Sequence, residues 1–369
     1  MNRKCHVFVP SVGLNLMSKY IVPTVKELRE QTENNNHLFE VVSLFAGGGG
    51  SSTGYRMAGG KVLAINEFIP EAVKTYSANW PTTKIIPNDI RQVTGQQILD
   101  LIGKKKGELD ILDGSPPCSA FSTAGSREKG WGKEKKYSDS SQSNVEDLFF
   151  EYIRILRDVS PKVFVAENVS GLAKGTAKGY LNEIIRQLRA SGYNVTCKIL
   201  DAKWLGVPQS RTRTIFVGIR NDLWLESMKD KTHPKPLDNI VTLSDAFDGL
   251  MFTDKDRQQT DLSKYAVYQL LKTLKKGETH HKAFTLVKAS PNNTSPCIKA
   301  TTGKIGARES YHWDNRAFTV AEIKRIMSVP DDYILTGTYQ QQVERLGRMV
   351  APFMMREVAK NILSLGVLK

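Results

Sequence analysis

The chain has 369 residues, of which 40% are hydrophobic and 24% are charged, a composition typical of globular proteins. It contains no run of about 18 to 20 apolar residues, so we expect no membrane-spanning helix. Its 52 Lys and Arg residues outnumber its 38 Asp and Glu residues, and the net charge of +14 favours a polyanionic partner such as nucleic acid. A basic surface without such a partner is the alternative that charge alone leaves open.

The cysteine usage indicates a reducing compartment. The four cysteines lie far apart and form no Cys-x-x-Cys pair, which fits free thiols rather than a disulfide framework or a zinc site. They are Cys5, Cys118, Cys197 and Cys297. The pair His280 and His281 has no second ligand pair at a suitable spacing, so we predict no metal site. The apolar start is cut by Pro10 and is too short for a signal peptide, so we expect a cytoplasmic protein.

Residues 1–37 carry only weak patterns. Thr24 and Glu27 have the spacing of a capping box, which predicts a short helix after Thr24. The run of three asparagines over 34–36 is typical of a turn or linker. We assign no chemistry to this N-terminal extension.

A buried strand is predicted over residues 39–45, and it ends in the glycine-rich stretch 46–54 before a helix. Glycines at such a turn let the backbone approach a ligand closely and present amide donors at the start of a helix. The stretch is neither the lysine-bearing P-loop nor a dinucleotide fingerprint, so alone it indicates only a nucleotide site of some kind.

The next two strands are predicted over 62–67 and 84–86, with a helix over 70–79 between them. An acidic residue stands at or just after the end of each strand. Glu67 is placed to accept from a ribose hydroxyl pair, and Phe68 to cover an adenine face. Asp89 is placed to accept from the adenine amino group. Each carboxylate alone fits a solvated loop equally well, but their order along a βαβαβ unit favours one shared adenosine site.

A fourth strand over 109–112 leads into Gly114-Ser115-Pro116-Pro117-Cys118-Ser119. The two prolines fix φ and remove two backbone donors, so they present the Cys118 thiol from a stiff segment. A buried structural cysteine is the alternative that this stretch alone leaves open. The following residues, 119–146, are rich in Gly, Ser and Lys and are predicted to form a basic lid.

Helical periodicity returns over 147–156, and a fifth strand over 163–166 ends at a second acid, Glu167. After a helix over 180–190, Arg211 and Arg213 alternate in front of a strand over 214–219 and are predicted to share one face. Such a pair suits a phosphate or a base edge, and an ion-paired surface is the alternative. Residues 343–365 predict one long helix with an apolar core face.

Four stretches carry a resemblance to a known family. They are Phe45-Ala46-Gly47 with Gly49-Gly50, Pro116-Pro117-Cys118, Glu167-Asn168-Val169, and Gln209-x-Arg211-x-Arg213. In this order and at these intervals they resemble the DNA cytosine carbon-5 methyltransferases. The resemblance covers about residues 38–222 and resumes over about 316–365, where Met327-Ser328-Val329-Pro330 is similar to part of the family's ninth motif.

The resemblance implies an α/β fold: a Rossmann-like, S-adenosylmethionine-dependent methyltransferase sheet with helices on both faces, plus a small irregular target-recognition domain. It implies Cys118 as nucleophile, Glu167 as the acid at ring nitrogen 3 of cytosine, and Arg213, with Arg211 beside it, at the flipped base. It also implies a set of residues around the cofactor. These are Phe45, Ala46, Gly47, Gly49, Gly50, Glu67, Phe68, Asp89, Ile90, Pro117 and Leu148.

The implied residue types suit the reaction. Carbon 5 of cytosine is too weak a nucleophile to take a methyl group directly, so a thiolate first adds to carbon 6 and makes the ring an enamine. Protonation at nitrogen 3 by Glu167 drains the charge that this addition creates. Because the target face is stacked inside the duplex, the base must leave the helix first.

Two departures from the family pattern stand out. Arg348 occupies the place of the asparagine usual in the tenth motif, which puts one cofactor contact in doubt. Ser119 follows Cys118 where many members have glutamine, and the lid is long. Neither departure removes a catalytic residue.

The resemblance implies four parts: an N-terminal extension over 1–37, a catalytic domain over 38–222, a target-recognition domain over 223–315 and a C-terminal return over 316–369. It implies duplex DNA as substrate, a monomer, and a cognate restriction endonuclease as partner if the enzyme is a restriction companion rather than a solitary one. An RNA cytosine methyltransferase and a catalytically silent DNA-binding relative remain alternatives, with a dehydrogenase as a remote one.

Overall fold

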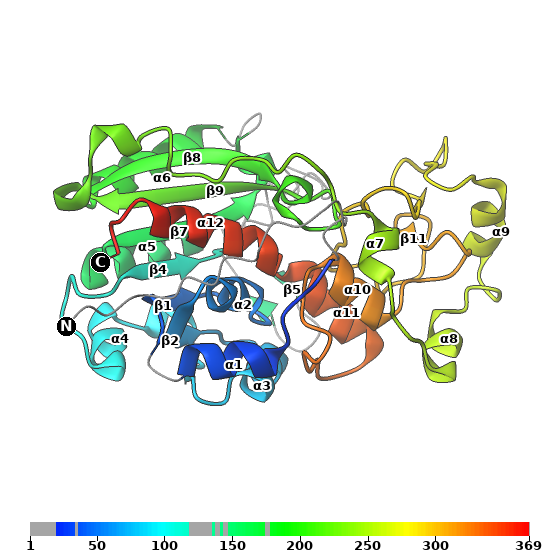
Figure 1. Cartoon of the computed structure of the whole chain (residues 1–369), viewed down its shortest axis with the longest axis horizontal. Helices are drawn as coiled ribbons and strands as arrows, with labels where there is room; N and C mark the ends of the chain where they lie inside the picture. The colour runs from blue at the N-terminus through cyan, green and yellow to red at the C-terminus, as the bar shows by residue number, and fades with distance from the viewer. Residues whose placement is uncertain are drawn as a thin grey trace, which may run out of the picture.

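The computed structural model describes residues 20–33, 36–117, 135–136, 141–142, 147–173 and 178–368. Its centre is a seven-stranded sheet in the order β3-β2-β1-β4-β7-β9-β8 (Figure 1). The strands are β1 Phe39–Leu44, β2 Gly60–Asn66, β3 Lys84–Ile86, β4 Ile111–Gly114, β7 Val163–Val169, β8 Tyr193–Asp201 and β9 Thr212–Arg220. The five strands from β3 to β7 in this order pair in parallel, whereas β9 is antiparallel to both β7 and β8.

Helices cover both faces of this sheet. One face packs on α2 Gly50–Met57, α3 Pro70–Asn79 and the C-terminal helix α12 Pro352–Ser364, and the other on α4 Gly95–Ile102, α5 Leu148–Val159 and α6 Lys178–Ala190. Short 3-10 turns fill the connections at η1 Ile90–Gln92, η4 Ser170–Ala173 and η6 Ala202–Leu205. The predicted Rossmann-like sheet with helices on both faces is therefore confirmed.

Several predicted elements appear with nearly the expected bounds. The helix predicted over 70–79 is α3, which begins with Pro70 at its first turn, where the missing proline N–H costs nothing. The capping box of Thr24 and Glu27 is present, because each residue's backbone N–H donates to the other's side chain. It opens α1 Val25–Glu33.

Helix α1 is fastened to distant parts of the chain. The backbone N–H of Val25 donates to Asp332 at 2.8 Å, and Arg29 donates to the carbonyl oxygens of Ala78 and Asn79 at the end of α3. The hydroxyl of Tyr20 donates to Arg325 O at 2.7 Å. The extension thus joins α3 to the C-terminal part of the chain.

The prediction of one helix over 343–365 is wrong. Two helices cover most of this range, the end of α11 Tyr339–Arg348 and the whole of α12, and they follow the separate helix α10 Val320–Ile326. Pro352 lacks the N–H that a continuous helix needs, and the residue before it, Ala351, is extended with ψ 124°. The break turns α12 back onto α2, so that residues 347–351 pass beside the start of α2.

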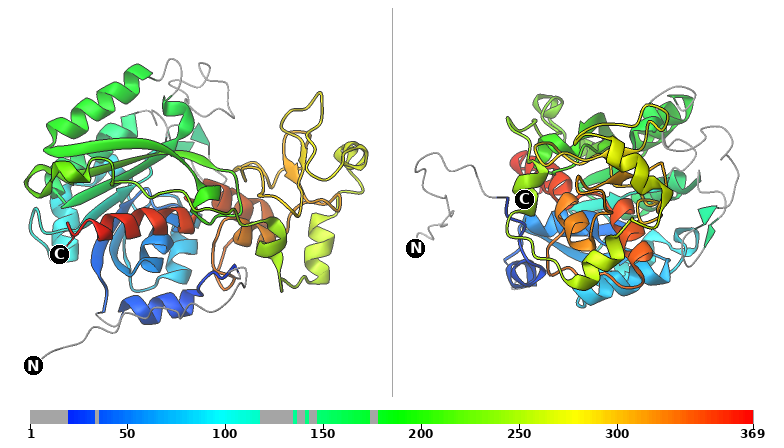
Figure 2. Two further views of the ribbon diagram at one scale, coloured as in Figure 1. Left: turned by 45° about the horizontal axis from the view of Figure 1, so that its top comes forward. Right: turned by 90° about the vertical axis from the view of Figure 1, so that its right-hand side faces the viewer.

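After β9 the chain forms η7 Asn221–Leu223 and η8 Glu226–Met228, which pack at the end of the sheet beside β8 and α12, and then runs back along the sheet (Figure 1). The residues from α7 to α10 form a smaller unit to one side of the sheet (Figures 1 and 2). Its elements are α7 Leu243–Phe247, α8 Asp254–Thr260, α9 Ala266–Thr273, β10 Val287–Lys288 and β11 Ser310–Tyr311. It has a small core of its own around Leu262, Leu271 and Leu286. The unit is irregular, as the poor sequence periodicity predicts.

The predicted lid lies mostly outside the described residues. Within it the structure describes only the backbone of two short antiparallel strands, β5 Lys135–Lys136 and β6 Ser141–Gln142. Cys118 also lies outside the described residues. In the part of the chain that the structure describes, none of the helices has the length and apolar character needed to cross a bilayer.

Candidate active site

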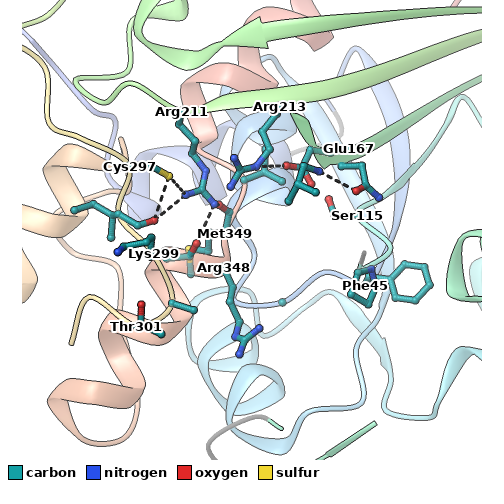
Figure 3. Close-up of a pocket in the computed structure, with 18 of the residues that line it drawn as sticks. Phe45, Ser115, Glu167, Arg211, Arg213, Cys297, Lys299, Thr301, Arg348 and Met349 are labelled. Carbon is teal, nitrogen blue, oxygen red and sulfur yellow. Dashed lines mark hydrogen bonds and ion pairs between the residues drawn. The ribbon is translucent and has the colours of Figure 1, made fainter. Parts of the chain in front are cut away.

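A cavity of about 1070 Å³ opens at the carboxyl ends of the central strands (Figure 3). Its walls come from the loops after β1, β2, β4 and β7, from the start of β9, and from residues 297–309 and 347–350. Ligands of open α/β sheets bind at this edge, because the loops there converge from neighbouring parallel strands. The candidate residues predicted from the sequence lie mostly on these same loops.

The glycine-rich stretch forms a tight turn between β1 and α2. Phe45 and Gly47 have positive φ values of 54° and 55°, and Gly49, with φ 89°, is the N-cap of α2. Phe45, Ala46 and Gly47 line the cavity. The turn therefore brings its first residues to the cavity wall just before α2 begins.

Two glycines of this turn serve a purpose that the sequence prediction missed. A Cβ on Gly48 would lie 2.3 Å from Met349 Cε, and one on Gly50 would lie 2.2 Å from Val350 O. Side chains there would push away the segment between α11 and α12. Gly49 and Gly50 are absent from the cavity wall that the described residues form, so their predicted cofactor contacts stay predictions.

Glu67 follows β2 and lines the cavity with Phe68. Its carboxylate accepts from the backbone N–H groups of Gly47 at 2.7 Å and Ile69 at 2.8 Å. Burial raises the pKa of Glu67, and these backbone donors partly offset that shift. A buried acid held by two backbone groups is a rigid acceptor at the cavity wall.

The remaining predicted cofactor residues divide into two groups. Ile90 and Pro117 line the cavity. Asp89 caps η1 by accepting from Arg91 N at 3.0 Å, and it pairs with the Arg91 side chain. Leu148 is fully buried at the start of α5. Neither Asp89 nor Leu148 belongs to the described cavity wall, so their contacts with a cofactor stay predictions.

The approach to Cys118 runs along the cavity. Ser115, Pro116 and Pro117 all line it, and Asn168 Nδ2 donates to Pro116 O at 3.1 Å. This contact ties the loop after β4 to the end of β7. The last described residue before Cys118 is therefore at the cavity wall.

Glu167 and Arg213 form an ion pair inside the cavity, with Arg213 Nε 2.7 Å from Glu167 Oε1 (Figure 3). Glu167 is only 8% exposed. The antiparallel register of β7 and β9 produces this pair, since it sets Val169 opposite Arg213 and brings the two strand ends together. The predicted acid and the predicted base-contacting arginine are thus neighbours.

Arg211 lies before β9 and takes different partners from Arg213, although both line the cavity. Its guanidinium donates to the carbonyl oxygens of Ile298, Gly347 and Met349, each at 2.9 Å, and contacts Cys297 Sγ at 3.4 Å. Burial, together with the positive charge of nearby Arg213, lowers the pKa of Arg211 to about 10. Because these donors are engaged, the geometry favours a positioning role for Arg211.

Replacing Arg211 by lysine should lower the free energy of unfolding by about 2–4 kcal/mol, because one ammonium cannot satisfy acceptors on two separate segments. Urea unfolding followed by circular dichroism measures this change. Arg186→Lys on α6 is the matched control, since Arg186 pairs with Glu183 on the surface and its side chain is 68% exposed. Equal midpoints for the two variants would contradict the anchoring role.

The wall opposite the sheet carries several basic side chains, from Lys299, Lys304, Arg308 and Arg348. Arg348, which stands where the family usually has asparagine, pairs with Glu344 at 2.8 Å. Lys299 pairs with Glu309 at 3.2 Å. The net effect is a basic rim on the side of the smaller unit.

One buried carboxylate was missed by the sequence analysis. Asp113 in β4 is fully buried, and its Oδ2 accepts from the hydroxyls of Ser43 at 2.6 Å and Ser51 at 2.8 Å. Its Oδ1 accepts from Tyr55 at 3.2 Å. The sequence feature that could have revealed Asp113 is an acidic residue directly after the apolar residues Ile111 and Leu112 of a buried strand. Ser43 and Ser51 line the cavity, so Asp113 lies directly behind the wall.

Among the residues that the structure describes, no cluster of three or more His, Cys, Asp or Glu side chains is arranged to hold a metal ion. His280 and His281 stack on each other, with ring centroids 4.6 Å apart, in the smaller unit.

Comparison with solved structures gives the class of fold. The chain is similar to a DNMT2 mutant from Spodoptera frugiperda, with a TM-score of 0.65 and 21% sequence identity over 88% of this chain and 99% of that chain. It is also similar to Dnmt2 methyltransferase from S. pombe, with a TM-score of 0.59 and 17% identity over 89% of this chain and 98% of that one. The fold is that of the S-adenosylmethionine-dependent methyltransferases.

Residues 39–364 match the model of the C-5 cytosine-specific DNA methylase family, and the chain belongs to that family. It is 28% identical over 364 residues to the Type II methyltransferase M.SacI from Streptomyces achromogenes, which covers 85% of this chain and 90% of that protein. As a member of the C-5 cytosine-specific DNA methylase family, this chain therefore transfers a methyl group from S-adenosylmethionine to carbon 5 of cytosine in DNA.

Proposed function

We propose that the cavity holds the cofactor at its Glu67 end and a flipped cytosine at its Glu167 end, with Cys118 as the nucleophile. The observation that supports this most is the convergence on one cavity of the glycine-rich turn, Glu67, the Pro116-Pro117 approach and the pair of Glu167 and Arg213. Its volume of about 1070 Å³ is at the upper end for small-molecule sites, which suits a cofactor and a base together.

The residues at the Glu67 end fit S-adenosylmethionine. A buried carboxylate suits the ribose hydroxyl pair, the aromatic ring of Phe68 suits an adenine face, and the exposed backbone of Gly47 suits the polar amino-acid part. When bound, the cofactor supplies an activated methyl group. The protein's part is to fix that methyl group between the two ends of the cavity.

Glu67→Ala should raise the KM for S-adenosylmethionine by roughly 10- to 100-fold, with less change in the KM for DNA, because a cofactor hydroxyl pair loses its buried acceptor. Steady-state methylation with each substrate varied in turn measures the split. Glu183→Ala, an exposed acid on α6, is the control and should leave both values unchanged. A selective fall in DNA affinity instead would place the cofactor elsewhere.

At the other end, the Cys118 thiolate adds to carbon 6 of cytosine while Glu167 gives a proton to nitrogen 3. Carbon 5 then takes the methyl group, and loss of its proton together with the Cys118 bond restores the aromatic ring. Arg213 holds Glu167 in place before the base arrives.

We propose that the segment 223–315, which contains the smaller unit, reads the target sequence. The part around Leu262, Leu271 and Leu286 has a small core of its own and can vary without disturbing the sheet, whereas Met228 at the start of the segment packs in the core of the sheet. It is anchored through the end of the segment, where Ser210 N donates to Ser295 O and Ile298 N donates to Gln209 Oε1. An exchange of recognition segments should therefore stop before Ser295.

Exchanging residues 249–294 for those of a relative with another target should move the methylated sequence while the chemistry continues, because base-edge contacts are separable from backbone contacts. Bisulfite sequencing of host DNA, with and without each gene, measures the targets. An active hybrid that keeps the original target would contradict the assignment of recognition to this segment.

We further propose that the enzyme acts as a monomer and protects DNA against a cognate restriction endonuclease. M.SacI is named as a Type II methyltransferase, which supports this role. Expression of the gene should make host DNA resistant to one endonuclease of the same target sequence, and gel filtration should give the mass of one chain.

A further inference from the structure

Asp113 occupies a central position between the two ends of the cavity. The sheet order β2-β1-β4-β7 sets Ile65, Ser43, Asp113 and Val165 side by side in register. Glu67 follows Ile65 by two residues, and Glu167 follows Val165 by two residues. Asp113 therefore lies below the middle of the cavity, between the proposed cofactor end and the proposed cytosine end.

The charge of Asp113 has no countercharge in the described part of the chain. The groups that face it are the hydroxyls of Ser43 on β1 and of Ser51 and Tyr55 on α2. Tyr152 on α5 and Glu167 on β7 are the other titratable groups near it. A buried carboxylate held only by neutral donors gains from a cation nearby.

The cavity in front of Asp113 is where such a cation arrives. S-adenosylmethionine carries a positively charged sulfonium, and its product S-adenosylhomocysteine carries a neutral thioether. The two molecules otherwise share the same groups, apart from one methyl. Ser43 and Ser51 line the cavity and bond directly to the Asp113 carboxylate, so one layer of side chains joins the buried charge to the cavity, and charges interact more strongly there than in bulk water.

We infer that Asp113 is the residue that makes this site favour the cationic cofactor over its neutral product. This inference rests on the proposal that the cavity binds the cofactor. Asp113 acts through space, behind Ser43 and Ser51, and touches neither the cofactor nor the base. Methyl transfer removes the charge that Asp113 attracts, and this weakens the hold on the product at the moment when it must leave.

The inference carries a specific pH dependence. Burial raises the pKa of Asp113 to about 6, against the lowering effect of its three hydroxyl partners, and Glu167 adds to the rise. Above that pH the carboxylate is ionised and attracts the sulfonium. Below it Asp113 is neutral and the attraction is lost. The preference for the cation should therefore grow as the pH rises through about 6.

The test is the ratio of two dissociation constants, for S-adenosylhomocysteine and for S-adenosylmethionine, measured on the full-length protein by isothermal titration calorimetry between pH 5 and pH 8. Groups common to both ligands cancel in this ratio. For the wild-type protein we expect the ratio to rise about tenfold across this range. For Asp113→Asn we expect a ratio that stays low and flat.

Two further variants separate charge from structure. Asp110→Asn is the matched control, because Asp110 lies just before the same strand, away from the cavity, and pairs with Lys162; its ratio should follow the wild type. Ser51→Ala keeps the Asp113 charge but removes one donor, so it should move the rise in the ratio to higher pH. If the role of Asp113 were purely structural, Asp113→Asn would weaken the binding of both ligands by the same factor and leave the ratio unchanged.

The possible failures are distinguishable. If neither ligand binds the wild-type protein competitively with the other, the proposed cofactor site is wrong. If both bind but the wild-type ratio does not change with pH, or Asp113→Asn keeps the wild-type ratio, the inference about Asp113 is wrong while the cofactor site stands. If Asp113→Asn does not fold, Ser51→Ala decides the matter, because Ser51 donates to Asp113 and a pH profile that Ser51→Ala leaves unmoved would assign the titration to another acid of the cavity, such as Glu67.

Discussion

Cys118→Ala is expected to lower the rate of methyl transfer by roughly 10⁴-fold or more while leaving DNA affinity unchanged. Only the covalent step needs the sulfur, whereas binding depends on the basic rim and on the contacts to phosphates. Transfer of a labelled methyl group measures the first quantity, and fluorescence anisotropy at fixed salt measures the second. Substantial methylation by the variant would contradict the assignment of the nucleophile.

Two other thiols serve as controls. Cys297 lines the same cavity, 3.4 Å from Arg211 Nη1, and is the described thiol best placed to compete as a nucleophile. Cys197 is on β8, and burial raises its pKa to about 11, so it is unreactive at neutral pH. With 5-fluorocytosine in the target DNA, the trapped adduct should map to Cys118 in Cys197→Ala and Cys297→Ala alike. An adduct on Cys297 would overturn the mechanism.

Glu167→Gln is expected to reduce kcat by about 10²- to 10⁴-fold, because the amide cannot deliver a proton to nitrogen 3 when the thiolate adds. The substitution keeps the size of the side chain, so Arg213 retains an oxygen to which it can donate. Single-turnover methylation isolates this step from product release. The affinity for DNA containing a target cytosine should change little in comparison.

Arg213→Lys gives the matched comparison for that result. It retains a positive charge next to Glu167 but loses the guanidinium geometry, so it should reduce the rate by less than Glu167→Gln does. A Glu167→Gln variant with a wild-type single-turnover rate would remove Glu167 from the mechanism.

The succession of the strands along the chain and the candidate loops at their ends could be predicted from the sequence, because both depend on local patterns. Apolar runs that end in glycine or an acid gave the ends of β1, β2 and β7, and Pro70 marks the start of α3. Glu167 and Arg213 were both assigned to the base, but their ion pair was not predicted, because it depends on the pairing of β7 with β9.

The partners of Arg211 and Asp113 could not be predicted in this way. Arg211 donates to carbonyl groups 136 and 138 positions away, and Asp113 binds hydroxyls 70 and 62 positions away. Backbone carbonyls carry no sequence signature, and a serine has many possible roles. Such contacts depend on how distant segments pack. The division between α11 and α12 was available locally, since Pro352 marks it.

The packing of α12 against α2 has a consequence for how this enzyme is made. A Cβ on Gly54 of α2 would lie 2.4 Å from Pro352 O and 2.7 Å from Met355 Cβ, so these two helices touch backbone to backbone. The ribosome makes them about 300 residues apart, and α1 likewise waits for Asp332. The surface of α2 that α12 covers must remain exposed through most of translation, when aggregation competes with folding. Because residues 347–350 also form part of the cavity wall, the active site is complete only after α11 and α12 have been made.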